Sequence, residues 1–130
     1  MESALRYELT QSVPELKHQT FPTNAPEEAE KPYLVYSRIR TNKEKVLDGY
    51  TGEEALSYMF SVMAKKYGDM VEIRKQVEEL LIGMVKREVG DTNKFYVEDL
   101  TINKIEEQYE HELKINRGII DFTIYFEGVK

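Results

Sequence analysis

The sequence predicts an α+β fold, with an N-terminal helix and one long amphipathic helix packed on a mostly antiparallel sheet of about four to five strands. Between residues 69 and 86, apolar side chains recur every three or four positions, which is the period of an α-helix. Residues 119 to 126 alternate between two faces, which is the period of a strand. The other strand-like segments come in runs with one helix between them, and this order favours an antiparallel sheet.

The length and composition predict a single domain spanning residues 1–130. A chain of 130 residues can bury a core without disulfides, and this chain has no cysteine. No apolar run approaches the ~20 residues of a membrane span, and the first residues do not resemble a secretory signal. We therefore expect synthesis in the cytoplasm and no membrane contact. The net charge of −6 argues against specific nucleic-acid binding, which requires a surplus of Lys and Arg.

The first half of the chain predicts one helix and two strands. Residues 2–12 have apolar positions at helical spacing, and Val13-Pro14 ends that pattern. Residues 16–21 predict a short strand, and residues 33–39 predict a second strand rich in β-forming residues. Residues 40–52 are polar, contain two glycines and predict a long hairpin connection.

The segment from residue 54 to residue 64 fits either a strand covered on both faces or a helix, because both periods are present. A capping box formed by Thr51 and Glu54 would support the helix. Aromatic and β-branched residues favour the strand, with Gly68 as the turn into the following helix. That helix is expected to begin at Asp69, with Glu72 completing its N-terminal cap.

The last third of the chain predicts a pair of strands. Residues 90–94 form a turn cluster, a strand starts at residues 100–105, and a strong alternation follows at 119–126. The acidic run at residues 106–112 surrounds His111 and could be imagined as a cation site. A solvated strand end or turn is the favoured interpretation, because surface charge runs rarely hold metals.

No motif in the sequence points to catalysis. The two histidines, His18 and His111, stand in separate segments, and neither has a second histidine at metal-ligand spacing. The serines have no nucleophile-elbow context, and the scattered glycines form neither a phosphate-binding loop nor a dinucleotide fingerprint. We therefore predict no catalytic, cofactor-binding or metal-binding residue, no cofactor, and a protein that is not an enzyme.

Several motifs in order resemble one family. They are Val13-Pro14, residues 21–39 (FPTNAPEEAEKPYLVYSRI), the apolar positions of the predicted helix from Tyr67 to Leu80, and the C-terminal segment RGIIDFTIY at residues 117–125. This order resembles the tail terminator, or tail completion (tail-to-head joining), proteins of long-tailed bacteriophages and phage-like elements. Each motif alone consists mostly of residues that form cores and turns, and it is therefore not specific. The resemblance rests on the order and spacing of the motifs, and it covers nearly the whole chain.

The resemblance implies a non-enzymatic virion assembly protein. Such proteins form a six-membered ring that caps the tail tube and helps to join tail to head. The implied partners are further copies of the chain, the tail tube protein and the head connector protein. The implied locations are the bacterial host cytoplasm during assembly and then the virion tail. The alternatives are another head–tail connector or head-completion protein, or a small protein-binding module.

A ring of identical subunits needs two different surfaces that meet between neighbours. Loops that bury little alone are the expected source of such contacts. We therefore predict a subunit interface on the long connection and on the Pro-flanked acidic loop. Its residues are Lys43, Glu44, Lys45, Tyr50, Glu27, Glu28 and Glu30.

Overall fold

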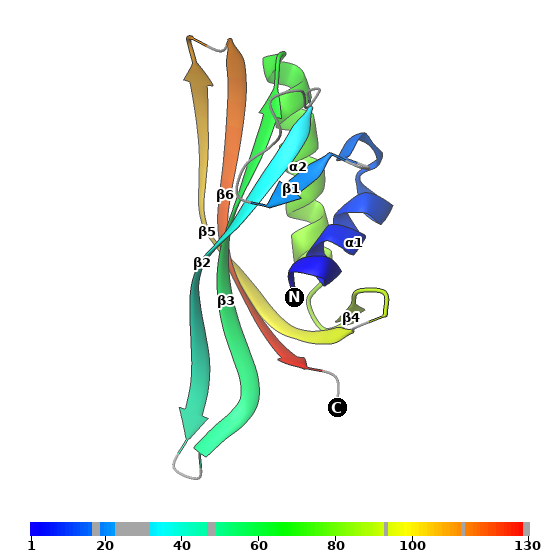
Figure 1. Ribbon diagram of the computed structural model, residues 1–130, viewed down its shortest axis with the longest axis vertical. Helices are drawn as coiled ribbons and strands as arrows, with labels where there is room; N and C mark the ends of the chain where they lie inside the picture. Colours follow the sequence, from blue (N-terminus) through cyan, green and yellow to red (C-terminus); the bar gives the residue numbers. More distant parts are fainter. Residues whose placement is uncertain (17–18, 23–31, 47–48, 93, 113, 129–130) are drawn as a thin grey trace.

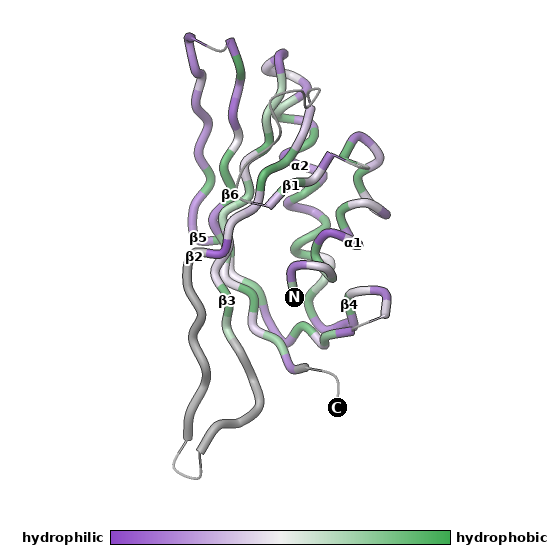
Figure 2. The backbone as a smooth tube through the Cα atoms, viewed as in Figure 1, coloured by the Kyte–Doolittle hydropathy of each residue, from purple (hydrophilic) through white to green (hydrophobic). Residues whose placement is uncertain are grey.

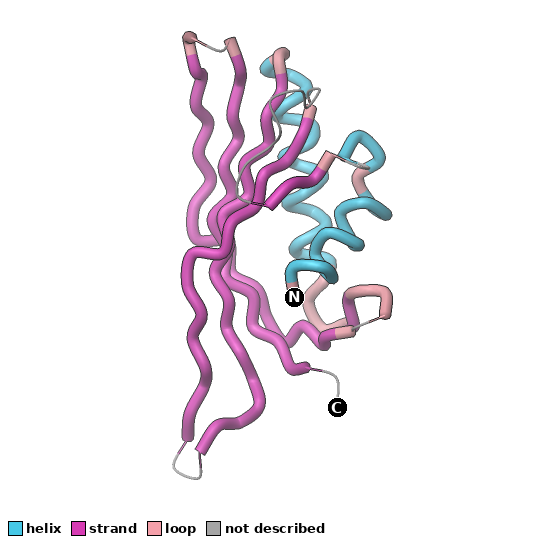
Figure 3. The backbone as a smooth tube through the Cα atoms, in the orientation of Figure 1, coloured by secondary structure: helices cyan, strands magenta, loops and turns pink. Residues whose placement is uncertain are grey.

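The computed structural model describes residues 1–16, 19–22, 32–46, 49–92, 94–112 and 114–128, and for residues 39–46, 49–54 and 128 it describes the backbone alone. Both helices lie on one side of a curled sheet (Figures 1 and 3). The elements in chain order are α1 (Glu2–Ser12), the 3₁₀ turn η1 (Pro14–Leu16), β1 (Thr20–Pro22), β2 (Tyr33–Val46), β3 (Gly49–Ala64), α2 (Tyr67–Gly83), β4 (Glu88–Val89), β5 (Phe95–Glu110) and β6 (Ile115–Gly128).

The strands form one sheet in the order β1-β2-β3-β6-β5-β4. Only β1 and β2 pair in parallel, so the predicted α+β class with a mostly antiparallel sheet is confirmed. The sheet has six strands where four to five were expected, and β4 was missed because its two residues are too short to show any periodicity. The strand expected at residues 16–21 is shifted, since Pro14–Leu16 form the 3₁₀ turn and Thr20–Pro22 form β1.

The core lies between α2 and the two central strands. On β3 and β6, the rings of Tyr58 and Phe122 stack with centroids 5.8 Å apart, and Phe60 meets Phe122 edge-on at 4.8 Å. The helix side of this core consists of Met70, Ile73, Val77, Leu80, Leu81 and Met84. The strand interpretation of residues 54–64 is therefore confirmed, as is the packing of the helix against that strand.

The polar segment from residue 40 to residue 52 is mostly strand, so its prediction as a long connection is wrong. β2 continues to Val46 and β3 starts at Gly49, with backbone pairs such as Lys43 with Glu54 and Lys45 with Tyr50. Ladder hydrogen bonds join backbone groups and need no apolar side chains. A strand without a covered face shows no alternation, and its sequence therefore resembles a loop.

The start of α2 also differs from the prediction. Its N-cap is Lys66, which makes no side-chain capping hydrogen bond, and the first helical bond runs from the Met70 N–H to the Lys66 carbonyl at 3.1 Å. Gly68 therefore lies inside the helix and is not the turn before it. Asp69 lies in the first turn, where a carboxylate stabilises the positive end of the helix dipole without acting as the cap.

α1 is held to the end of α2 by a partly buried ion pair. The Arg87 guanidinium donates to the Glu8 carboxylate at 2.7 Å and to the Gly83 carbonyl at 3.1 Å. The second Glu8 oxygen accepts the Gly90 N–H at 3.3 Å. One carboxylate on α1 thus fixes both the last turn of α2 and the turn after β4.

Candidate functional site

The hairpin of β2 and β3 projects beyond the helix-covered part of the molecule (Figure 1). The last backbone pair between β3 and β6 joins Glu53 to Glu127, so from Gly49 to Gly52 the described residues give strand β3 one neighbour, β2. A two-stranded ribbon of this kind has no core of its own to support it. It therefore forms an arm that can reach another molecule.

The structure brings together four of the seven predicted interface residues. Lys43, Glu44 and Lys45 lie on β2 near the end of the hairpin, and Tyr50 lies on β3, where its backbone pairs with that of Lys45. The other three residues, Glu27, Glu28 and Glu30, lie outside the described residues. The interface assignment itself stays a prediction for all seven.

A second surface lies where α2 meets strand β5, which sequence reasoning did not single out. Ile105 and Tyr109 on β5, and Tyr67 at the start of α2, are large hydrophobic side chains that remain exposed. β5 itself is mostly hydrophilic (Figure 2). The signal that could have found this surface is the pair Ile105 and Tyr109, because Ile105 directly precedes the acidic run at residues 106–112 and Tyr109 lies inside it.

Glu107 organises the polar contacts at this surface. Its carboxylate accepts a hydrogen bond from the Tyr67 hydroxyl at 2.8 Å and lies 3.4 Å from the Arg74 guanidinium. That hydrogen bond to Glu107 raises the pKa of Tyr67 above its ordinary value. Arg74 also pairs with Glu78 one turn along α2. The acidic run therefore includes the end of a strand, as expected, but part of its charge is paired, which was not expected.

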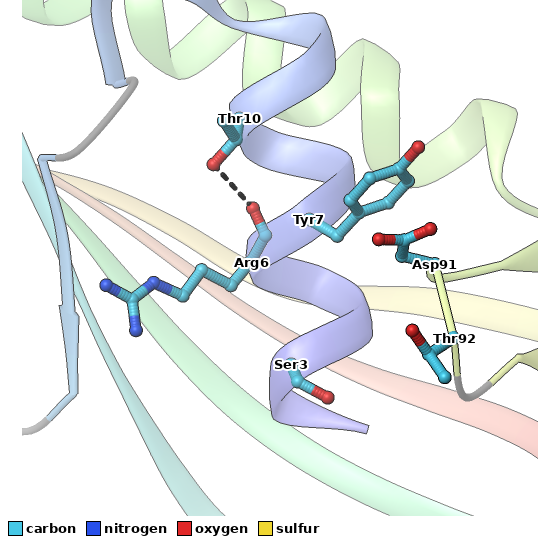
Figure 4. A pocket seen from close by; sticks show the side chains of 6 residues that line it. All are labelled: Ser3, Arg6, Tyr7, Thr10, Asp91 and Thr92. Atoms are coloured by element: carbon cyan, nitrogen blue, oxygen red, sulfur yellow. Dashed lines mark hydrogen bonds between the residues drawn. The ribbon is translucent and has the colours of Figure 1, made fainter.

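The surface depressions offer no evident chemistry. One, of about 350 Å³, lies between α1 and the turn after β4 (Figure 4). Its Thr10 hydroxyl donates to the Arg6 carbonyl at 2.9 Å, while the Arg6 side chain points away from Tyr7 and Asp91. In the described part of the chain, no three His, Asp or Glu side chains are grouped to hold a metal ion.

An α+β subunit with a projecting hairpin and open sheet edges is typical of proteins that work inside larger assemblies. A match to a known protein family shows which assembly is concerned. The model of the family "Tail completion protein gp17" matches residues 4–127, so the chain belongs to that family. It is a structural protein of a phage-type virion tail.

Solved structures include a similar fold. A chain in a structure titled "Virion of native gene transfer agent (GTA) particle" superposes with a TM-score of 0.75 at 11% sequence identity. The match covers 98% of this chain and 95% of that chain, and at such low identity it shows the fold alone. A search of curated proteins found no match. No helix within the described ranges is long and apolar enough to cross a membrane.

Proposed function

We propose that this protein closes the end of the tail tube as a ring of identical subunits, and that the ring also docks the head connector. The single observation that carries this proposal is the family match over residues 4–127. The projecting hairpin supports it, because a ring needs one surface of each copy to meet a different surface of the next. Six copies is the number that the family resemblance implies.

The charge of the chain fits such a ring. The genome has to pass through a tail on ejection, and a passage that held phosphates tightly would retard it. The net charge of −6 gives the subunit no general attraction for phosphates. In this proposal the ring is assembled in the cytoplasm of the bacterial host and stays in the virion tail.

Electron microscopy of tails made without this protein tests the proposal. Overlong tubes without heads are expected, because nothing would stop polymerisation at the correct length. Tails of normal length that fail to join heads would instead identify a head-completion or connector protein. Tails of normal length joined to heads would overturn both functions.

A charge reversal on the hairpin tests the predicted interface. We expect Lys43→Glu with Lys45→Glu to give overlong or unattached tails while the isolated subunit still folds. The matched control is Lys65→Glu with Lys75→Glu, which changes the charge equally at two exposed positions near and on α2. If the hairpin variant folds and yields normal tails joined to heads, the hairpin is not an assembly surface.

A further inference from the structure

Two long strand edges have no neighbour among the described residues. β1 pairs with β2 only from Leu34 to Tyr36, so the edge of β2 is open from Ser37 to Val46. β4 pairs with Phe95 and Tyr96, and Val97 exchanges hydrogen bonds with the segment before β4. The edge of β5 is therefore open from there to Glu110. An open edge presents a row of backbone N–H and C=O groups to any strand that can pair with it.

The two open edges carry opposite charge. From residue 37 to residue 46, β2 has four basic residues and one acidic residue. One of the basic residues, Arg38, already pairs with Glu2 on α1 at 3.6 Å. From residue 98 to residue 110, β5 has five acidic residues and one basic residue. Three of these carboxylates already have ion-pair partners, with Glu106 beside Lys104, Glu107 beside Arg74 and Glu110 beside Arg117.

Two acidic residues on β5 are left for an outside partner. Glu98 and Asp99 form no ion pair with any described residue, and Asp99 is exposed. They lie at the start of the open edge, beside an irregularity in the β5–β6 pairing. A basic strand that approached this edge would therefore meet carboxylates that have no cationic partner in the described part of the subunit.

The directions of the two strands also match. β2 is antiparallel to β3, β3 to β6 and β6 to β5, so β2 and β5 run in opposite directions within one subunit. A second copy turned about a ring axis keeps the same strand directions. Its β2 would then lie antiparallel to β5 of the first copy, and the alternation would continue unbroken around the ring.

We propose that β2 of each subunit pairs with β5 of the next, so that the sheets of the ring join edge to edge into one closed barrel. This proposal rests on the ring proposed above and names the surfaces that hold it together. Pairing between two β2 edges or two β5 edges would bring like charges together, which is unfavourable. The charges therefore select the head-to-tail contact that a ring requires.

The geometry of such a barrel is reasonable. The middle of the open β5 edge is Lys104, which the pairings across β6 and β3 place level with Ser37 of β2. The middle of the open β2 edge lies about four to five residues further along β2. To bring the two middles together, each subunit must shift along the strand direction by roughly 15 Å relative to its neighbour. The four long strands of one subunit, β2, β3, β6 and β5, are together roughly 19 Å wide. Closing the ring then tilts the strands by about 40°, inside the usual barrel range of roughly 35–45°.

Disulfide trapping on tail tubes tests the pairing, because the natural chain has no cysteine. One cysteine replaces Lys104 on β5, and a second replaces each β2 residue from Arg38 to Lys45 in turn. Within one subunit these strands are three spacings apart, about 14 Å, so no disulfide can form inside a copy. Any disulfide must therefore join neighbouring subunits.

We expect at least one of these pairs to give a ladder of linked subunits on tails assembled with it. Variants with a single cysteine, on β2 or on β5, should stay unlinked and serve as controls. Linking through one cysteine alone would indicate pairing between like edges and overturn the proposal. Tails of normal length with no linkage from any pair would also overturn it, while leaving the ring function standing.

A charge exchange gives an independent measurement where a cysteine pair disturbs assembly. Glu98→Lys with Asp99→Lys, and separately Lys43→Glu with Lys45→Glu, should each give overlong tails. Combining all four substitutions should restore normal tail length, because the edges become complementary again. If tails made with the combined variant are as overlong as those made with either separate variant, β2 and β5 do not pair. The length of tails made without this protein tests the ring function separately.

Discussion

At position 118, the sheet leaves no space for a side chain. A Cβ atom added to Gly118 would lie 2.6 Å from the Met70 sulfur and 3.1 Å from the Arg74 Cδ atom. Met70 is buried and cannot swing away without displacing its own neighbours. The missing side chain therefore sets how closely α2 approaches β6.

We predict that Gly118→Ala lowers the free energy of unfolding by about 1–3 kcal/mol, as overpacking of a core does. Denaturant unfolding measures this change. The control is Gly68→Ala, since nothing lies within 4 Å of that position and alanine favours a helix. Its stability should be unchanged or higher by up to about 1 kcal/mol. Equal effects of the two substitutions would contradict the close approach at Gly118.

Sequence reasoning identified the glycines only as scattered positions. Nothing in the residues around Gly118 shows that a helix more than thirty positions earlier passes over it. Contacts of this kind depend on tertiary structure and leave no local pattern. The same limit explains why Glu8, whose partner Arg87 is far away in the sequence, was not recognised as a link between α1 and α2.

At the scale of elements, α2 contributes a full face to the core. Leu80 belongs to the buried core that α2 shares with β3 and β6, whereas Ile82 on the same helix is 61% exposed. We predict that Leu80→Ala lowers the free energy of unfolding by about 2–5 kcal/mol because it leaves a cavity. Ile82→Ala should change it by no more than about 0.5 kcal/mol. A small loss for Leu80→Ala, measured by thermal or denaturant unfolding, would contradict this packing.

The elements predicted best are those with the strongest periods. α1, α2 and β6 each bury a regular face, so their apolar residues repeat visibly along the chain. β3 also buries a regular face, but its residues 54–64 fit the helical period as well. The far end of the β2–β3 hairpin and the two-residue β4 have no such repeat. The α2 start was misplaced because Asp69 and Glu72 match a capping box, while the helix begins two residues earlier, at Tyr67, without a side-chain cap.

At the scale of the whole molecule, the open edges determine how the subunit behaves alone. We predict that the isolated protein is a monomer in analytical ultracentrifugation at physiological salt. The β2 and β5 edges are charged, and each contains irregularities in its pairing, which are features that discourage spontaneous edge contacts. The tail tube would then supply the template on which copies meet. A stable hexamer in the absence of tubes would contradict this prediction.

The candidate site was only partly predictable. The order of weak motifs identified the family, and the polar segment around Lys43 and Lys45 was singled out for its contacts. The sequence alone did not show that this segment is a strand, nor that β5 forms the opposite edge of the same sheet. Which strands lie at the edges follows from the order β1-β2-β3-β6-β5-β4, and no local pattern specifies that order.

The position of β6 in the middle of the sheet has a consequence for synthesis. β3 pairs with β6 from Glu53–Glu127 to Ala64–Asn116, which joins residues made far apart in time on the ribosome. Until β6 emerges, Tyr58 and Phe60 lack the Phe122 ring against which both pack. Contacts of such long sequence separation also slow folding, to roughly milliseconds or seconds. A nascent chain therefore cannot complete the sheet until β6 is made, because β6 lies between β3 and β5.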